Sequence, residues 1–362
     1  MKLTIPPNIQ SIRPYSTGKP IEELARETGA EKIVKLASNE NPLGPSPLAL
    51  EALRGALDGI HRYPDGSAYA LVKKLSALLA VEPETVVVGN GSDDLIGMLT
   101  RALLSPGDEA IMGKPSFLMY DITTRVSGAA PVAVPLKDLT IDLDSFLDRV
   151  TEKTRMVFVC NPNNPTGTVV SRSRFESFLE ALPDSVVVVI DEAYAEFVRD
   201  IDSPRGLDYL GCGKPVVVLR TFSKAYGLAG LRIGYGIMPA AVASLLHRVR
   251  QPFTANLLGQ VAAAAALDDT AFLDRTVRLT HEGLDFLYHA LDQSGIRYFP
   301  TQTNFFLIDV ERDADEIYRR LLAHGIIVRS MTSYDYPTCI RVNVGLSEEN
   351  TRFIEALRKV LS

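Results

Sequence analysis

Between residues 86 and 220, short apolar runs alternate with segments in which apolar residues recur at helical spacing. The apolar runs are VVVG at 86–89, MVFVC at 156–160, VVVVI at 186–190 and VVVLR at 216–220. Helical spacing is found at 93–104 and at 172–182. Apolar strands that alternate with helices are typical of a parallel sheet covered on both faces. We therefore predict the α/β fold class, with a mostly parallel central sheet covered by helices.

The pattern changes after about residue 250. A helical pattern at 276–295 is followed by three shorter strands, with another helix between the first two. This order is typical of an α+β domain. We predict an N-terminal segment at 1–45 that packs on the small domain, a large domain at 46–251 and a small α+β domain at 252–362.

Composition and charge narrow the possible functions. The chain has 362 residues, of which 46% are hydrophobic and 23% charged, and its net charge is −6. This charge gives no electrostatic reason to bind nucleic acid or an anionic membrane. The sequence contains neither an apolar run of about 18 residues nor a secretory signal. The cysteines Cys160, Cys212 and Cys339 form no disulfide or zinc pattern, so we expect a soluble cytoplasmic protein.

Generic nucleotide and metal motifs are incomplete in this chain. GNGSDD at 89–94 has Asp94 where a dinucleotide-binding fingerprint needs its third glycine, and no P-loop motif is present. His281 and Glu282 begin like a zinc-protease motif, but Asp285 stands where the second histidine belongs. The sequence therefore favours neither a nicotinamide cofactor nor a metal site.

Polar residues follow each of the apolar runs. In open α/β sheets, ligands bind beyond the carboxyl ends of the strands. We therefore expect the polar groups at these ends to lie close together. They are Asn90-Gly91-Ser92-Asp93, the turn from Asn161 to Gly167, Asp191-Glu192-Ala193-Tyr194 and Thr221-Phe222-Ser223-Lys224.

Several of these residues together have the chemistry of a cofactor site. A lysine such as Lys224, in a partly desolvated cleft, has a lowered pKa and forms a Schiff base with an aldehyde. Asp191 ends an apolar strand, where a carboxylate is costly unless it faces a cation such as a protonated pyridine nitrogen. Tyr194 and Asn164 suit a phenolic oxygen on the same ring. Each residue alone fits an ordinary structural role, but the combination favours a cofactor.

A phosphate site is predicted beside them. Gly91, Ser92 and Asp93 open a helix whose free N–H groups suit a phosphate. Ser223 adds a hydroxyl, and Arg232 adds a charged fork of donors. Aldehyde, pyridinium, phenol and phosphate are the functional groups of pyridoxal 5′-phosphate (PLP), which we predict as the cofactor and electron sink.

The blocks NPNNPTG, IDEAY and SKAYGLAGLRIGY resemble the signatures of the fold type I PLP-dependent aminotransferases, and the resemblance runs over essentially the whole chain. It implies a large PLP-binding domain and a smaller one. The residue roles that it implies are Lys224 as the aldimine lysine, Asp191 as the partner of the ring nitrogen, Tyr194 and Asn164 at the phenolic oxygen, and Ser92, Asp93, Ser223 and Arg232 at the phosphate. Phe117, in KPSFLMY, would stack on the ring where many relatives carry tyrosine.

The N-terminal half is most similar to the histidinol-phosphate aminotransferases, in the stretches at 13–24, 35–47 and 61–71. This resemblance implies a homodimer in which Tyr63 reaches the cofactor phosphate of the neighbouring subunit. It also implies substrate-binding roles for several side chains. Arg341 matches an arginine that binds the α-carboxylate, and Arg329, Tyr15 and Asn164 would form a pocket for the substrate phosphate.

The implied reaction is a ping-pong exchange of an amino group between L-histidinol phosphate and 2-oxoglutarate in histidine biosynthesis. Lys224 would move a proton as general base and then acid. The loop SYDYPTCIR at 333–341 departs from the usual wording of this family. Two alternatives therefore stay open: an aromatic or broad-range aminotransferase, and a PLP-dependent lyase similar to threonine-phosphate decarboxylase.

Overall fold

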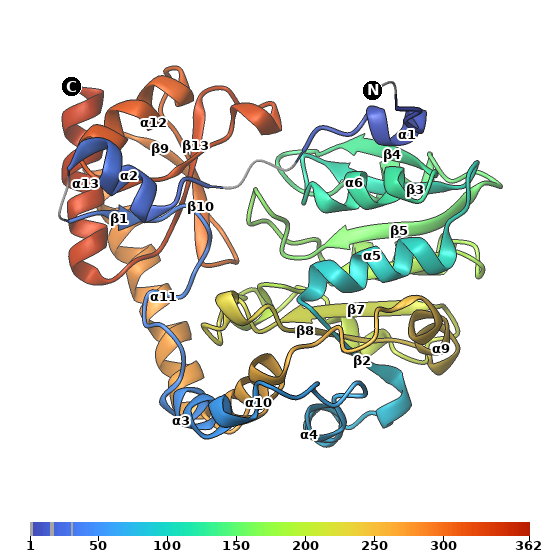
Figure 1. Ribbon diagram of the computed structural model, residues 1–362. Helices are drawn as coiled ribbons and strands as arrows, with labels where there is room; N and C mark the ends of the chain where they lie inside the picture. The colour runs from blue at the N-terminus through green and yellow to red at the C-terminus, as the bar shows by residue number, and fades with distance from the viewer. Residues whose placement is uncertain (1–2, 15–17, 30–31) are drawn as a thin grey trace.

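The computed structural model describes residues 3–14, 18–29 and 32–362. Its largest element is a seven-stranded sheet in the order β2-β8-β7-β6-β5-β3-β4 (Figure 1). The strands are β2 (Val86–Gly89), β3 (Glu109–Lys114), β4 (Ala130–Pro135), β5 (Thr154–Cys160), β6 (Val187–Asp191), β7 (Val216–Thr221) and β8 (Gly234–Ile237). β8 runs antiparallel to both of its neighbours, and the other neighbouring strands are parallel. The predicted α/β class with a mostly parallel sheet is confirmed.

Helices cover this sheet. They are α5 (Ser92–Leu103), α6 (Met119–Val126), α7 (Leu143–Leu147), α8 (Arg172–Ala181) and α9 (Ala240–Val249). α5 packs on β2, β7 and β8, and α9 packs on α5. α8 begins where the Ser171 side chain accepts a hydrogen bond from the Arg174 N–H, a typical N-cap. α5 and α8 are the helices predicted at 93–104 and 172–182.

An additional helical layer comes from distant parts of the chain. It consists of α3 (Pro47–Ala56), α4 (Tyr69–Leu79) and α10 (Leu257–Ala266). Ala262 and Ala263 of α10 are fully buried in the same core as Ala49 of α3. The small alanine side chains let these two helices approach closely. The core of the large sheet therefore extends to Leu267. The domain limits given above stay a prediction.

A second sheet of four antiparallel strands lies on the other side of the molecule (Figure 1). Its order is β12-β13-β10-β9, with β9 (Arg297–Phe299), β10 (Phe305–Asp309), β12 (Arg329–Ser330) and β13 (Cys339–Asn343). Helices α11 (Thr270–Asp292), α12 (Ala314–Ala323) and α13 (Ser347–Leu361) accompany it. Phe306, Ile340 and Phe353 are buried in a core separate from that of the large sheet.

The N-terminal segment contacts both parts of the molecule. α1 (Pro7–Gln10) packs on α6, whereas Leu24 of α2 (Ile21–Thr28) packs in a small cluster with Ile327. β1 (Val34–Lys35) pairs in parallel with β11 (Ile326–Ile327). Short 3-10 helices complete the structure: η1 (Leu57–Gly59), η2 (Pro83–Thr85), η3 (Ala195–Phe197), η4 (Gly206–Tyr209), η5 (Ala229–Leu231) and η6 (Thr332–Tyr334). Within the described residues, no helix is long and apolar enough to cross a membrane.

Candidate active site

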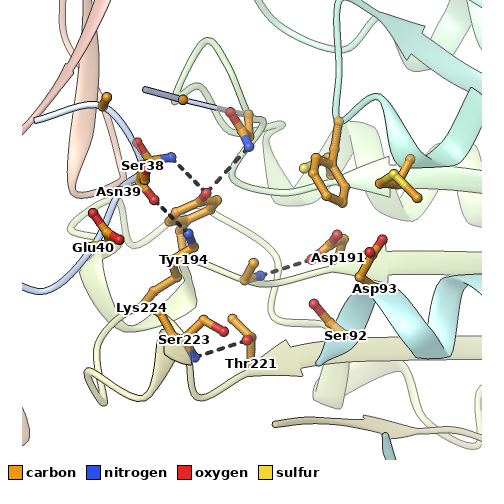
Figure 2. A pocket seen from close by; sticks show the side chains of 18 of the residues that line it. Ser38, Asn39, Glu40, Ser92, Asp93, Asp191, Tyr194, Thr221, Ser223 and Lys224 are labelled. Carbon is orange, nitrogen blue, oxygen red and sulfur yellow. Dashed lines mark hydrogen bonds between the residues drawn. The ribbon is translucent and has the colours of Figure 1, made fainter. Parts of the chain in front are cut away.

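A cavity of about 630 Å³ lies at the carboxyl ends of the strands of the large sheet (Figure 2). Residues from β12 and β13 of the small sheet and the segment 37–40 also line it. The predicted site residues that line this cavity are Ser92, Asp93, Phe117, Asn164, Asp191, Tyr194, Ser223, Lys224, Arg232, Arg329 and Arg341. The structure therefore brings together the strand ends that the sequence pattern placed at one edge.

Two carboxylates share one corner of the cavity. Asp191, the last residue of β6, is 4% exposed and accepts hydrogen bonds from the Tyr120 hydroxyl (2.6 Å) and the Ala193 N–H (3.1 Å). Burial raises the pKa of Asp191 to about 6, although the bond from Tyr120 opposes the rise. Burial also raises the pKa of Asp93, whose Oδ1 has no hydrogen-bond partner within the described chain. Such a pair suits a ligand with a positive charge.

Lys224 lies opposite these carboxylates, just after β7. Its Nζ donates to the Ser38 carbonyl oxygen (3.2 Å) and lies 5.7 Å from the centre of the Tyr194 ring. Burial, followed by the nearby charge of Arg341, lowers the pKa of Lys224 to about 8. A substantial fraction of this amine is therefore uncharged just above neutral pH, as a nucleophile or general base requires.

Tyr194 lies between Lys224 and the small sheet and is 3% exposed. Its hydroxyl oxygen accepts hydrogen bonds from Asn39 Nδ2 (2.9 Å) and Asn164 Nδ2 (3.5 Å). Burial raises the pKa of this phenol above its ordinary value. Tyr194 therefore keeps its hydrogen at neutral pH and is available as a donor.

Next to Asp93, the cavity is suited to an anion (Figure 2). Helix α5 begins there, and its N-cap Gly91 has φ 88°, a conformation that favours glycine. A Cβ atom at Gly91 would lie 2.8 Å from Arg232 Nη2, so a larger residue would push the guanidinium away. Arg232 Nη1 in turn lies 3.4 Å from the Ser223 hydroxyl. Helix N–H groups, a hydroxyl and a guanidinium therefore meet at one place.

Two arginines enter the cavity from the small sheet. Arg329 on β12 lies directly opposite Arg341 on the antiparallel β13. Arg341 donates to Asn164 Oδ1 (2.5 Å) and to the Ala37 carbonyl oxygen (3.0 Å). Its Nε has no partner among the residues that the structure describes. This wall therefore offers positive charge to an anionic substrate group.

Two of the predicted site residues that the structure describes, Gly91 and Tyr63, do not line the cavity. Gly91 borders it as the N-cap of α5. Tyr63 is 83% exposed and stacks on Phe253, with ring centres 4.6 Å apart. Tyr15 lies outside the described residues.

Other residues of the site were not predicted. Ser38, Asn39, Glu40 and Cys160 line the cavity, and Tyr120 holds Asp191 from behind. The polar stretch SNEN and the tyrosine three positions after Phe117 were the available signals, but neither follows one of the apolar runs. Within the described ranges, no group of three or more His, Cys, Asp or Glu residues is arranged to hold a metal.

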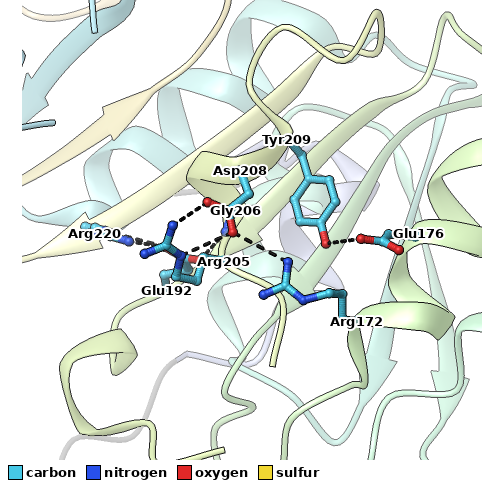
Figure 3. A network of polar contacts seen from close by, with 8 residues as sticks. All are labelled: Arg172, Glu176, Glu192, Arg205, Gly206, Asp208, Tyr209 and Arg220. Carbon is cyan, nitrogen blue, oxygen red and sulfur yellow. Dashed lines mark hydrogen bonds and ion pairs between the residues drawn. The ribbon is translucent and has the colours of Figure 1, made fainter. Parts of the chain in front are cut away.

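A polar network surrounds Glu192, the residue that follows Asp191 (Figure 3). Glu192 is 3% exposed and pairs with Arg220 of β7, with 2.7 Å between Oε2 and Nη2. Its Oε1 accepts from the Gly206 N–H (2.5 Å). Because Glu192 directly follows Asp191, this buried ion pair fixes the backbone at the end of β6.

Residues 31–357 match the family model described as "Aminotransferase class I and II". The chain belongs to this family. The cavity that holds Lys224, Asp191 and Tyr194 is thus a cavity of an aminotransferase.

Curated relatives are similar over nearly the full length. A protein of Moorella thermoacetica named histidinol-phosphate aminotransferase is 46% identical over 355 residues, which are 98% of this chain and 92% of that protein. A Pseudomonas aeruginosa protein named histidinol-phosphate aminotransferase 2 is 47% identical over 358 residues, or 98% and 97% of the two chains. The predicted resemblance to this group of aminotransferases is confirmed.

Solved structures agree. The histidinol-phosphate aminotransferase of Sinorhizobium meliloti, solved in complex with pyridoxal 5′-phosphate, has a TM-score of 0.90 and 30% identity, covering 99% of this chain and 97% of that one. The aspartate aminotransferase of Thermus thermophilus, solved with maleate, has a TM-score of 0.85 at 23% identity, covering 99% and 100%. The second likeness shows a shared fold.

Proposed function

We propose that the protein is a PLP-dependent aminotransferase that exchanges an amino group between L-histidinol phosphate and 2-oxoglutarate in histidine biosynthesis. The observation that carries this proposal is the cavity in which Lys224, with its lowered pKa, faces the buried carboxylate of Asp191. Relatives named histidinol-phosphate aminotransferase support the substrate.

The residues of the cavity fit PLP. The carboxylate of Asp191, with the unpartnered Asp93 Oδ1 nearby, would keep a pyridine nitrogen protonated. The backbone N–H of Asp93, in the first turn of α5, would keep the role at the phosphate that the resemblance implies. Tyr194 and Asn164 would bind the phenolic oxygen, and Phe117 would cover a face of the ring. Helix α5, Ser223 and Arg232 would hold the phosphate. When bound, PLP supplies an electron sink that stabilises a carbanion at the substrate carbon.

Lys224 is the proposed acid–base group. Its Nζ would take the proton from the substrate carbon that bears the amino group and then donate it to the C4′ carbon of the cofactor. The pKa of about 8 suits this role, because the amine loses and regains a proton close to neutral pH. The bond from Nζ to the Ser38 carbonyl holds the amine within the cavity.

Arg329 and Arg341 are the proposed substrate anchors. A phosphate in one half-reaction and a carboxylate in the other both need a cation at the same wall of the cavity. Amino acids with aromatic side chains also carry the carboxylate, so an aromatic aminotransferase remains the second candidate. Histidinol phosphate differs because its phosphate dianion calls for both guanidinium groups.

A homodimer with shared sites is also proposed. Tyr63 stacks on Phe253, and both rings are exposed. Leu57, Ile60 and Tyr69, close to Tyr63 in the sequence, are also exposed, so this part of the chain presents an apolar surface. Large apolar patches favour burial against another chain. A second copy would cover this surface and place its Tyr63 near the phosphate end of the neighbouring cavity. A cytoplasmic location stays a prediction.

Product analysis separates the candidate activities. With histidinol phosphate and 2-oxoglutarate, we expect glutamate to form in equal amount to the keto product, and no carbon dioxide. A kcat/KM for phenylalanine or tyrosine above that for histidinol phosphate would instead support the aromatic enzyme. Carbon dioxide release without 2-oxoglutarate would support a lyase.

A further inference from the structure

Asn39 occupies an unusual position beside the cavity. It is 2% exposed, and its φ of 56° lies in the left-handed region that few residues other than glycine and asparagine adopt. The backbone is held on both sides. Its N–H donates to Asn343 Oδ1 (3.1 Å), and its carbonyl oxygen accepts from Asn304 Nδ2 (3.1 Å). The surrounding structure therefore enforces a conformation that places the Asn39 side chain in the cavity wall.

The Asn39 side chain acts on Tyr194 (Figure 2). Asn39 Nδ2 donates to the Tyr194 hydroxyl oxygen at 2.9 Å, and Asn164 Nδ2 donates to the same oxygen at 3.5 Å. A phenol oxygen that accepts hydrogen bonds from amide groups directs its own hydrogen elsewhere. Among the residues that the structure describes, no acceptor takes this hydrogen. It is therefore free to point into the cavity.

We propose that Asn39 is a positioning residue that orients the Tyr194 hydroxyl as a hydrogen-bond donor toward the phenolic oxygen of the bound cofactor. This inference rests on the proposed function. Donation to the Tyr194 oxygen also makes its hydrogen a stronger donor, which favours negative charge on the cofactor oxygen.

Asn164 does not duplicate this role. Its contact with Tyr194 is longer, and its Oδ1 is held by Arg341 Nη1 at 2.5 Å. The orientation of the Asn164 side chain therefore depends on Arg341, a proposed substrate-binding residue. The Asn39 backbone is instead held by Asn343 and Asn304. The charged groups around Tyr194 are Arg341, Lys224 and Asp191. None of them accepts the phenol hydrogen in the described structure.

Two substitutions at Asn39 test the proposal. Asn39→Gly removes the side chain and keeps the backbone unstrained, because glycine adopts a positive φ readily. Asn39→Asp keeps the shape but replaces the donor by an acceptor, which would draw the Tyr194 hydrogen away from the cavity. Asn350→Ala is the matched control, because Asn350 is also 2% exposed but hydrogen-bonds the Gly345 backbone in the small-sheet part of the molecule.

The main readout is the pH midpoint at which the visible absorption band of the PLP-loaded protein changes. This midpoint reports how well the cofactor oxygen holds negative charge. We expect Asn39→Gly to raise it by about 0.5–1 pH unit, the effect of one hydrogen bond. Asn39→Asp should raise it at least as much, and Asn350→Ala should leave it unchanged. We also expect Asn39→Gly to lower kcat with little change in KM.

The outcomes separate this inference from the proposed function. An unchanged midpoint in Asn39→Gly, with the band intact, would overturn the role of Asn39 and leave the proposed function standing. A wild-type midpoint in Asn39→Asp would show that donation from position 39 is not needed, and would overturn it as well. Wild-type protein that shows no visible band with added PLP would overturn both.

Discussion

Replacing Tyr120 by phenylalanine tests how the carboxylate at the end of β6 is kept ionised. Tyr120 is fully buried, stacks on Phe158 with ring centres 4.6 Å apart, and donates to Asp191 Oδ2 at 2.6 Å. Phenylalanine keeps the ring and removes only the hydroxyl. Burial raises the pKa of Asp191 to about 6, and the bond from Tyr120 limits this rise. The substitution should therefore raise the Asp191 pKa further.

The expected size follows from the strength of this hydrogen bond. A bond to a charged group contributes about 1.5–3 kcal/mol, or about 1–2 pKa units. The pKa of Asp191 in the cofactor-free variant should then be about 7–8. At pH 7, the ionised fraction would fall from about 90% to between about 10% and 50%. PLP binding that needs the carboxylate should weaken by roughly two- to tenfold at this pH.

Titration of PLP binding from about pH 5 to about pH 9 provides the assay. Affinity should fall as the pH drops through the Asp191 pKa, and Tyr120→Phe should move this fall upward by about 1–2 units. Tyr209→Phe is the control, because Tyr209 also donates to a carboxylate, Glu176 Oε1 at 3.2 Å, but does not line the cavity. Equal pH profiles for wild type and Tyr120→Phe would refute the reasoning.

Three further substitutions have defined outcomes. The pKa of Asp191 is raised from 3.8 to about 6, so the ionised carboxylate destabilises the folded, cofactor-free protein. Asp191→Asn should therefore increase the free energy of unfolding in urea by up to about 3 kcal/mol above pH 6, and by nothing below about pH 4. Activity should be lost in this variant. Arg329→Ala should raise KM for histidinol phosphate more than for glutamate in steady-state kinetics, and equal effects would contradict a phosphate-binding role. Arg220→Met should destabilise the protein by about 3–5 kcal/mol, because it leaves the buried Glu192 carboxylate unpaired, and adding Glu192→Leu should restore part of the loss.

The parts of the fold that the sequence predicted depend on local patterns. β5, β6 and β7 are largely runs of apolar residues, and polar site residues lie at or within a few positions of their ends: Asn164 after β5, Asp191 at the end of β6 and Lys224 after β7. β8 was not predicted, because Gly234 and Gly236 interrupt any β-branched run. Glycine is needed there for a reason that only the structure reveals: a Cβ atom at Gly234 would lie 2.4 Å from the backbone nitrogen of Ser92.

The unpredicted site residues act through contacts between distant parts of the chain. Asn39 is held by Asn343 and Asn304, which are far away in sequence. Tyr120 lies within a helix, and nothing in its sequence neighbours indicates that its hydroxyl meets Asp191. Such contacts follow from tertiary packing, so a local pattern carries no signal for them.

The visible spectrum of the PLP-loaded protein, recorded before and after addition of L-histidinol phosphate without any keto acid, tests the central claim most directly. We expect the band of the lysine-bound cofactor to disappear as the amino group passes to it, and to return when 2-oxoglutarate is added. Lys224→Ala should bind PLP without this cycle. A wild-type band that histidinol phosphate leaves unchanged would contradict the proposed substrate.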